Sequence, residues 1–157
     1  MFELGRKISI IPMELKHLDE VYELEINSFS IPWTKESLRK EIEENKLAIY
    51  YVAANCEEDG NEKIVGYAGM WHVVTEGHIT NIVVGEEYRC RGIGNKLISK
   101  LIEIGKEKEM IGLTLEVRVG NKEAMLLYSK NGFVVEGYRK NYYADTKEDA
   151  LIMWKDL

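Results

Sequence analysis

Apolar positions along the chain follow two periods, one typical of strands and one typical of helices. Alternation at every second residue predicts strands, and spacings of three and four residues predict helices. The longest helical pattern runs over residues 92–108, where the apolar stripe is made by Ile93, Leu97, Leu101 and Ile104. An earlier helical pattern over residues 16–28 places Leu18, Val21, Tyr22 and Glu25 at helical spacing.

Turn and cap residues separate these patterns. Thr34 is expected to cap a helix that follows a bend at Pro32, and Asp59-Gly60 predicts a hairpin turn. Asn131-Gly132 is typical of a helix end. Strands are expected at residues 7–13, 48–56, 63–72, 78–84, 113–119, 133–140 and 150–154, and a fourth helix at 121–130. The order predicts one α/β domain over residues 1–157, with a mixed, mostly antiparallel sheet of about seven strands flanked by about four helices.

Length and charge restrict the function classes. A chain of 157 residues has room for about one domain, and 21 basic against 27 acidic residues give a net charge of 21 − 27 = −6. This balance argues against a protein that binds nucleic acid directly through a basic surface. The excess acid lies in residues 1–60, with 7 basic and 13 acidic side chains. Two interpretations stay open: solvated acidic helices, or a surface that attracts a cationic partner.

Neither the cysteines nor the apolar segments indicate export or a membrane. Cys56 and Cys90 are too few for a disulfide scaffold and lack the spacing of a zinc site. The longest apolar run, residues 47–54, is far shorter than the ~20 residues of a spanning helix. Residues 1–12 carry Glu3 and lack the apolar core of a signal peptide. We therefore expect a cytoplasmic protein.

The most informative segment is a glycine-bearing loop between a predicted strand and the long helix. It contains Arg89-Cys90-Arg91-Gly92-Ile93-Gly94. The amino end of a helix offers unpaired amides to a phosphate, and glycines allow close approach. The Walker motif is missing, and Leu97 stands where the dinucleotide motif needs a third glycine. The remaining pattern, R-x-x-G-x-G, is compatible with a phosphate loop or with an ordinary exposed loop and tight helix start.

Further segments favour the phosphate loop. They are residues 29–33 (FSIPW), 115–118 (LEVR), Asn121, 124–133 (AMLLYSKNGF) and 139–143 (RKNYY). Together with the loop, they resemble the GNAT superfamily of N-acetyltransferases, and within it the RimI-type ribosomal-protein-alanine N-acetyltransferases. The resemblance spans nearly the whole chain and implies the GNAT fold.

The resemblance implies acetyl-CoA as co-substrate and no metal. Its binding residues would be Ile82, Val83, Val84, Arg89, Cys90, Arg91, Gly92, Ile93, Gly94, Asn95 and Asn121. Residues 82–84 would act through their backbone, by pairing with pantetheine and pointing an amide at the thioester oxygen. A side chain at Gly94 would be expected to block the loop amides. Asn121 is also a candidate helix N-cap.

Glu116 and Tyr128 are the implied catalytic pair. Alternation along residues 113–119 turns Glu116 away from the apolar face, where it is a candidate general base. The alternative is an ion pair between Glu116 and Arg118. In RimI-type enzymes the tyrosine that matches Tyr128 is the general acid towards sulfur. The alternative for Tyr128 is a core residue with its hydroxyl at the edge.

The implied acceptor is the N-terminal α-amine of a protein, in particular a basic, alanine-initiated ribosomal protein. Candidate acceptor-binding residues are Trp33, Glu76, His78, Tyr142 and Tyr143. His78 is a rival to Glu116 as base, and the adjacent tyrosines are also compatible with ordinary packing. A lysine or small-molecule amine as acceptor, or a CoA-binding module without catalysis, are the alternatives.

Overall fold

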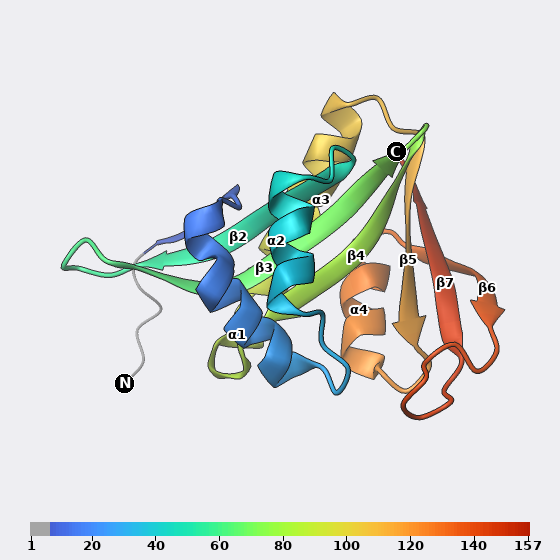
Figure 1. Ribbon diagram of the computed structural model, residues 1–157. Helices are drawn as coiled ribbons and strands as arrows, with labels where there is room; N and C mark the ends of the chain where they lie inside the picture. Colours follow the sequence, from blue (N-terminus) through green and yellow to red (C-terminus); the bar gives the residue numbers. More distant parts are fainter. Residues whose placement is uncertain (1–6) are drawn as a thin grey trace.

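The protein is a seven-stranded sheet with two helices on each face (Figure 1). A computed structural model describes residues 7–157, so Glu3 and the rest of residues 1–6 lie outside the described part. The strands are β1 (Ile8–Pro12), β2 (Ala48–Cys56), β3 (Glu62–Val73), β4 (Glu76–Val84), β5 (Gly112–Arg118), β6 (Val134–Arg139) and β7 (Ala150–Asp156). The helices are α1 (Leu18–Ser28), α2 (Lys35–Glu43), α3 (Ile93–Glu107) and α4 (Lys122–Lys130), with short 3-10 turns at Leu15–His17 and Glu86–Tyr88.

The sheet order β1-β2-β3-β4-β5-β7-β6 confirms the predicted mixed, mostly antiparallel topology. Among the strands of residues 7–157, only β4 and β5 pair in parallel, and the chain between them includes α3. The predicted elements are all present, with ends that differ by at most two residues. The helix predicted from residue 16 begins instead with the 3-10 turn, and the strand predicted from residue 78 begins at Glu76.

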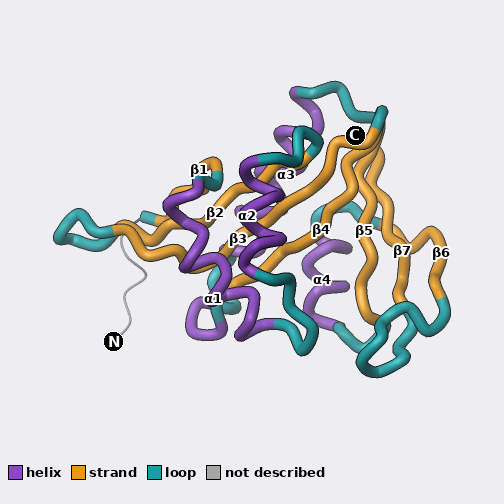
Figure 2. The backbone as a smooth tube through the Cα atoms, in the orientation of Figure 1, coloured by secondary structure: helices purple, strands orange, loops and turns teal. Residues whose placement is uncertain are grey.

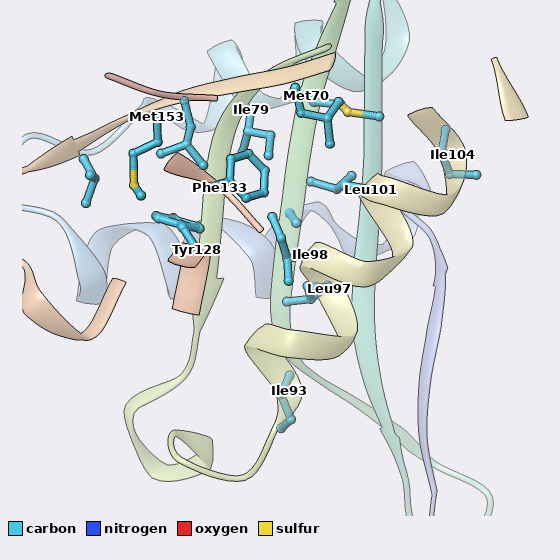
Figure 3. Close-up of a cluster of buried hydrophobic side chains, with 14 of the residues drawn as sticks. Met70, Ile79, Ile93, Leu97, Ile98, Leu101, Ile104, Tyr128, Phe133 and Met153 are labelled. Atoms are coloured by element: carbon cyan, nitrogen blue, oxygen red, sulfur yellow. The ribbon is translucent and has the colours of Figure 1, made fainter. Parts of the chain in front are cut away.

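Two buried clusters fix the layers. On one face, α1 and α2 contribute Val21 and Leu38 to a cluster with Tyr67 of β3. On the other, the stripe of α3 packs on the sheet together with Tyr128 of α4 and Phe133, as Figure 3 shows. The apolar stripe expected in the long helix is confirmed, because Ile93, Leu97, Leu101 and Ile104 are all buried.

The residues predicted to cap or end helices do so in the structure. The Thr34 hydroxyl accepts a hydrogen bond from the Ser37 amide (3.1 Å), and the Asn121 side chain accepts one from the Ala124 amide (3.1 Å). Gly132 follows α4 with a φ of +91°, a conformation that favours glycine. Asn121 is therefore the N-cap of α4, as the sequence allowed.

Strands β4 and β5 share only a short ladder. Three pairs join them, from Glu76 with Gly112 to His78 with Thr114. Beyond these pairs the strands diverge, and α4 lies at the opening (Figures 1 and 2). The ladder between β3 and β4 changes register between Met70–Ile79 and Gly69–Asn81, so Thr80 forms a bulge where the divergence begins. The carboxyl half of β4 thus leaves one edge open towards β5.

Two searches of residues 7–157 gave negative results. Among these residues no helix has both the length and the apolar content needed to cross a bilayer. The same residues contain no group of three or more His, Cys, Asp or Glu side chains arranged to hold a metal ion.

Candidate active site

A cleft of about 520 Å³ lies where β4 departs from β5. Its walls come from the carboxyl half of β4, the loop before α3 with the start of that helix, one side of α4 along its length, and Ser28 and Phe29 at the end of α1. The predicted cofactor-binding residues that line it are Ile82, Val83, Val84, Arg89, Cys90, Gly92, Asn95 and Asn121. Arg91, Ile93 and Gly94 belong to the same loop and helix start but not to the cleft lining, and the Ile93 side chain is buried.

The loop presents the amino end of α3 to this region. Gly92 is the N-cap with a φ of +81°, and the first backbone bond into the helix runs from the Lys96 amide to the Gly92 carbonyl (3.1 Å). The amides of Ile93, Gly94 and Asn95 therefore precede the first intrahelical donor. Nearby, Arg89 donates through Nε to the Val84 carbonyl (3.1 Å), which holds its charge at the end of β4. These amides and this guanidinium suit a diphosphate.

The two glycines of the loop have different roles. A Cβ at Gly92 would meet no atom within 4 Å, so this residue is required by its positive φ. A Cβ at Gly94 would lie 3.2 Å from Leu127 Cδ2. The expectation that a side chain at Gly94 blocks the amides stays a prediction, and the structure adds a second effect, because the Cβ would also meet Leu127 of α4.

Tyr128 lines the cleft and is also part of the buried core. It is only 9% exposed, and its ring packs against Phe133 with centroids 6.0 Å apart (Figure 3). Burial raises the pKa of the Tyr128 phenol, and Tyr143 acts in the same direction. Tyr128 is thus protonated at neutral pH, next to the cleft. Both interpretations of this residue agree with its position: it packs in the core and it also lines the cleft.

A second cavity of about 380 Å³ lies on the face of β5 that α3 and α4 do not cover. Glu116, Glu76 and His78 line it, with Thr114, Glu136, Arg139, Ile152 and Trp154. Glu116 pairs with Arg139 (3.5 Å), whereas Arg118 binds Asp145. The alternative ion pair between Glu116 and Arg118 is wrong: although both side chains project from the same face, the guanidinium turns to the chain between β6 and β7.

Both candidate bases share the second cavity. His78 Nε2 lies 3.1 Å from Glu76 Oε1, and the His78 side chain is 40% exposed. Glu116 is on the neighbouring strand, just past the last β4–β5 pair. Of residues 7–157, none lines both this cavity and the cleft with Tyr128. The candidate base and the candidate acid thus approach the β4–β5 opening from opposite faces of the sheet.

The remaining predicted residues lie outside both cavities. Trp33 is partly buried before α2, and its amide donates to Glu25 (3.1 Å). Tyr142 and Tyr143 pack edge to face with centroids 5.1 Å apart. Tyr143 lies beneath the Arg118 guanidinium, and partial burial raises its pKa to about 12.

Sequence reasoning missed a buried polar group behind β4. Glu25 of α1 is 1% exposed and accepts hydrogen bonds from the Tyr67 hydroxyl and the Trp33 amide. Asn81 donates through Nδ2 to the same Tyr67 oxygen (3.2 Å). The signal was present: Glu25 stands on the apolar stripe of its helix, four residues after Val21. A carboxylate in that position indicates a buried acceptor for polar groups.

Comparisons with known proteins concern the family and the fold of the chain. A family model described as Acetyltransferase (GNAT) family matches residues 18–133. A Bacillus subtilis (strain 168) protein is 46% identical over 148 residues, which cover 94% of this chain and 95% of the relative. That protein is provisionally named a [ribosomal protein bS18]-alanine N-acetyltransferase.

Solved structures extend the likeness to the fold. The ribosomal-protein-S18-alanine N-acetyltransferase from Escherichia coli superposes with a TM-score of 0.83 at 28% identity, over 96% of this chain and 94% of that one. Arabidopsis thaliana NAA60, solved in complex with acetyl-CoA, gives a TM-score of 0.86 at 17% identity, over 96% and 99% of the two chains. At that identity the second match concerns the fold alone. With the family model matching most of its length, the chain belongs to the GNAT family of acetyltransferases.

Proposed function

We propose that this GNAT acetyltransferase transfers acetyl from acetyl-CoA to the N-terminal α-amine of a protein, by direct attack while both substrates are bound. The observation that carries the proposal is the pair of cavities that approach one strand opening from opposite faces, one with Tyr128 and one with Glu116. Two substrates can thereby meet at the opening without sharing a binding surface. Residues 1–157 would form a single catalytic domain.

The cleft residues fit acetyl-CoA. The amides of residues 93–95 and the Arg89 guanidinium would bind the diphosphate, because helix-start amides and arginine stabilise phosphate charge. The exposed edge of Ile82–Val84 would pair with pantetheine and orient an amide towards the thioester oxygen. Asn121 and Tyr128 line the same cleft. When bound there, acetyl-CoA supplies an acetyl group activated as a thioester.

Two side chains of this protein would move protons. Glu116, or its rival His78, accepts a proton from the acceptor ammonium, whose pKa of ~7.7 to 8.0 demands only a modest base. The amine nitrogen then bonds to the acetyl carbon as the bond from carbon to sulfur breaks, and the nitrogen releases its second proton to solvent. Tyr128 donates its proton to the departing sulfur and is reprotonated from solvent. Because the pKa of Tyr128 is raised, this donation is expected to be concerted with bond cleavage.

The proposed acceptor is the alanine at the N-terminus of a ribosomal protein. The Bacillus subtilis and Escherichia coli relatives carry that acceptor in their names, and the likeness covers nearly all of both chains. Such an acceptor is basic, and this protein has a net charge of −6. Its encounter with ribosomal proteins would take place in the cytoplasm, with no direct contact to nucleic acid or a membrane.

The test measures thiol release with matched peptides. Acetyl-CoA and a basic peptide that begins with alanine are mixed with the protein, and free CoA is followed over time. The same peptide with a blocked N-terminus but free lysines is the control. Thiol release only with the free N-terminus supports the proposal. Equal release with both peptides indicates a lysine acetyltransferase, and no release with any amine indicates a CoA-binding module.

A further inference from the structure

The chain between β6 and β7, residues 140–149, is folded around one arginine of β5. Arg118 donates through Nη1 to Asp145 Oδ1 (2.9 Å) and through Nη2 to Asp145 Oδ2 (3.0 Å). Nη1 also donates to the Thr146 hydroxyl (3.1 Å), and the guanidinium carbon lies 3.9 Å from the centre of the Tyr143 ring. A two-pronged carboxylate contact and ring stacking are geometries that arginine provides and lysine does not.

Backbone bonds within this segment depend on the same side chains. The Thr146 amide donates to Asp145 Oδ1 (2.9 Å), and the Lys147 amide donates to the Tyr143 carbonyl (2.8 Å). The Thr146 hydroxyl in turn accepts from the Glu148 amide (3.2 Å). Since the segment has no regular secondary structure, Arg118 is the cation about which these turns are arranged.

Asp145 also reaches across to another part of the chain. The Ser30 hydroxyl donates to Asp145 Oδ2, and Ser30 directly follows Ser28 and Phe29, which line the cleft. We name the chain Ser30–Asp145–Arg118 the loop bridge. It connects the segment between α1 and α2 to the segment between β6 and β7, and its third member projects from the strand that carries Glu116.

We propose that Arg118 is a positioning residue for the acceptor. Through Asp145 it holds residues 140–149 against Ser30, and this fixes Tyr142 and Tyr143 in the position where they contact the acceptor peptide. This inference rests on the proposed function. It assigns to Arg118 the binding of acceptor and not of acetyl-CoA, because neither the three residues of the loop bridge nor the two tyrosines line the cleft that carries the phosphate loop.

Two members of the loop bridge, the Asp145 carboxylate and the Arg118 guanidinium, are charged at all physiological pH values. Hydrogen bonds from Ser30 and Arg118 lower the pKa of Asp145 to about 2, so its carboxylate remains ionised in the neutral range. Removing the guanidinium leaves that carboxylate with the Ser30 hydroxyl and the Thr146 amide, and removes the stacking contact with the Tyr143 ring. The segment should then lose its fixed position while the sheet stays intact.

The experiment compares Arg118→Gln with Arg39→Gln. The two arginine side chains are similarly exposed, 29% and 31%, and each pairs with two or more carboxylates, but Arg39 lies on the outer face of α2. For Arg118→Gln we expect the KM for the alanine-started peptide to rise about three- to tenfold, with the KM for acetyl-CoA within about twofold. Arg39→Gln should leave both constants unchanged, and Arg118→Lys should give only partial rescue.

A second readout is independent of activity. Hydrogen exchange at the amides of residues 143–148 should become faster in Arg118→Gln and in Asp145→Asn, and stay unchanged in Arg39→Gln. Unchanged exchange, or equal rises in both KM values, would overturn the inference. If instead the wild type releases no thiol with any peptide while exchange responds as expected, the proposed function fails and the bridge has only an architectural role.

Discussion

At the scale of single residues, Tyr128 combines burial with contact to the cleft. It packs on Phe133 and is 9% exposed, so its phenol is kept protonated by its surroundings. Glu116 has the opposite setting, because it lies on an open sheet face within reach of Arg139. This contrast between a desolvated acid and a solvated carboxylate is the physical basis for assigning opposite proton-transfer roles to them.

Replacing Tyr128 by phenylalanine should remove proton donation and keep the packing. We expect kcat to fall about 10²- to 10⁴-fold, with a KM for acetyl-CoA within about twofold of the wild type. Steady-state thiol release measures both constants. Tyr138→Phe, at a tyrosine of β6 that is 61% exposed, is the matched control. A large rise in acetyl-CoA KM without loss of kcat would make Tyr128 a binding residue.

The two candidate bases can be separated by charge removal. Glu116→Gln should lower kcat by about 100-fold or more if Glu116 takes the proton, and His78→Gln should lower it by less than about tenfold. Glu136→Gln removes a carboxylate from the same cavity and serves as the control. If the His78 variant shows the larger loss of kcat, His78 is the base.

At the scale of elements, the junction of α3 with α4 explains the glycine pattern of the phosphate loop. Gly92 needs its positive φ, whereas Gly94 gives Leu127 room. Leu127 in turn lines the cleft. A larger side chain at Gly94 would therefore displace Leu127 and change the shape of the cleft. The sequence motif alone does not reveal this effect, because Leu127 lies on another helix.

A double variant tests this route. Gly94→Val should push Leu127 aside, raise the acetyl-CoA KM and lower the melting temperature. If packing is the cause, Gly94→Val combined with Leu127→Ala should recover part of the acetyl-CoA KM relative to Gly94→Val alone, with Leu127→Ala alone as reference. No recovery in the double variant would show that valine obstructs the loop amides directly.

Most elements could be predicted from the sequence, but the contacts between distant segments could not. Periodicity located the strands and helices because each buries one face, and caps such as Thr34 and Asn121 mark local hydrogen bonds. The partner of Arg118 depends on the path of a loop 27 residues away, and strand alternation gives only the face. For the same reason, the hydrogen bond between Ser30 and Asp145, which joins two distant loops, could not be predicted from the sequence.

At the scale of the whole molecule, four tyrosines are held protonated by burial. The pKa values of Tyr50, Tyr67, Tyr128 and Tyr143 are all raised, mainly by desolvation. They come from both faces of the sheet: Tyr50 and Tyr67 lie in the cluster under α1 and α2, and Tyr128 in that under α3 and α4. Ionisation of these tyrosines at alkaline pH should therefore destabilise both packed layers.

The free energy of unfolding should accordingly fall at high pH. Unfolded tyrosine ionises near pH ~10, whereas these folded tyrosines ionise above it, so the unfolded chain binds fewer protons in this range and is favoured as pH rises. The contribution of these tyrosines to stability should be constant below about pH 10 and decline through pH 12. Urea unfolding at several pH values measures this, and Tyr128→Phe should decline less steeply. An identical slope in the variant would contradict this account of Tyr128.

The position of the two cavities on opposite sides of the β4–β5 opening also bears on how turnover ends. Under the proposed function, spent CoA would withdraw along α4, and the acetylated chain would retreat over the uncovered face of β5. Neither product then obstructs the departure of the other. Each product would therefore have its own exit route, and steric hindrance alone would impose no fixed order of product release.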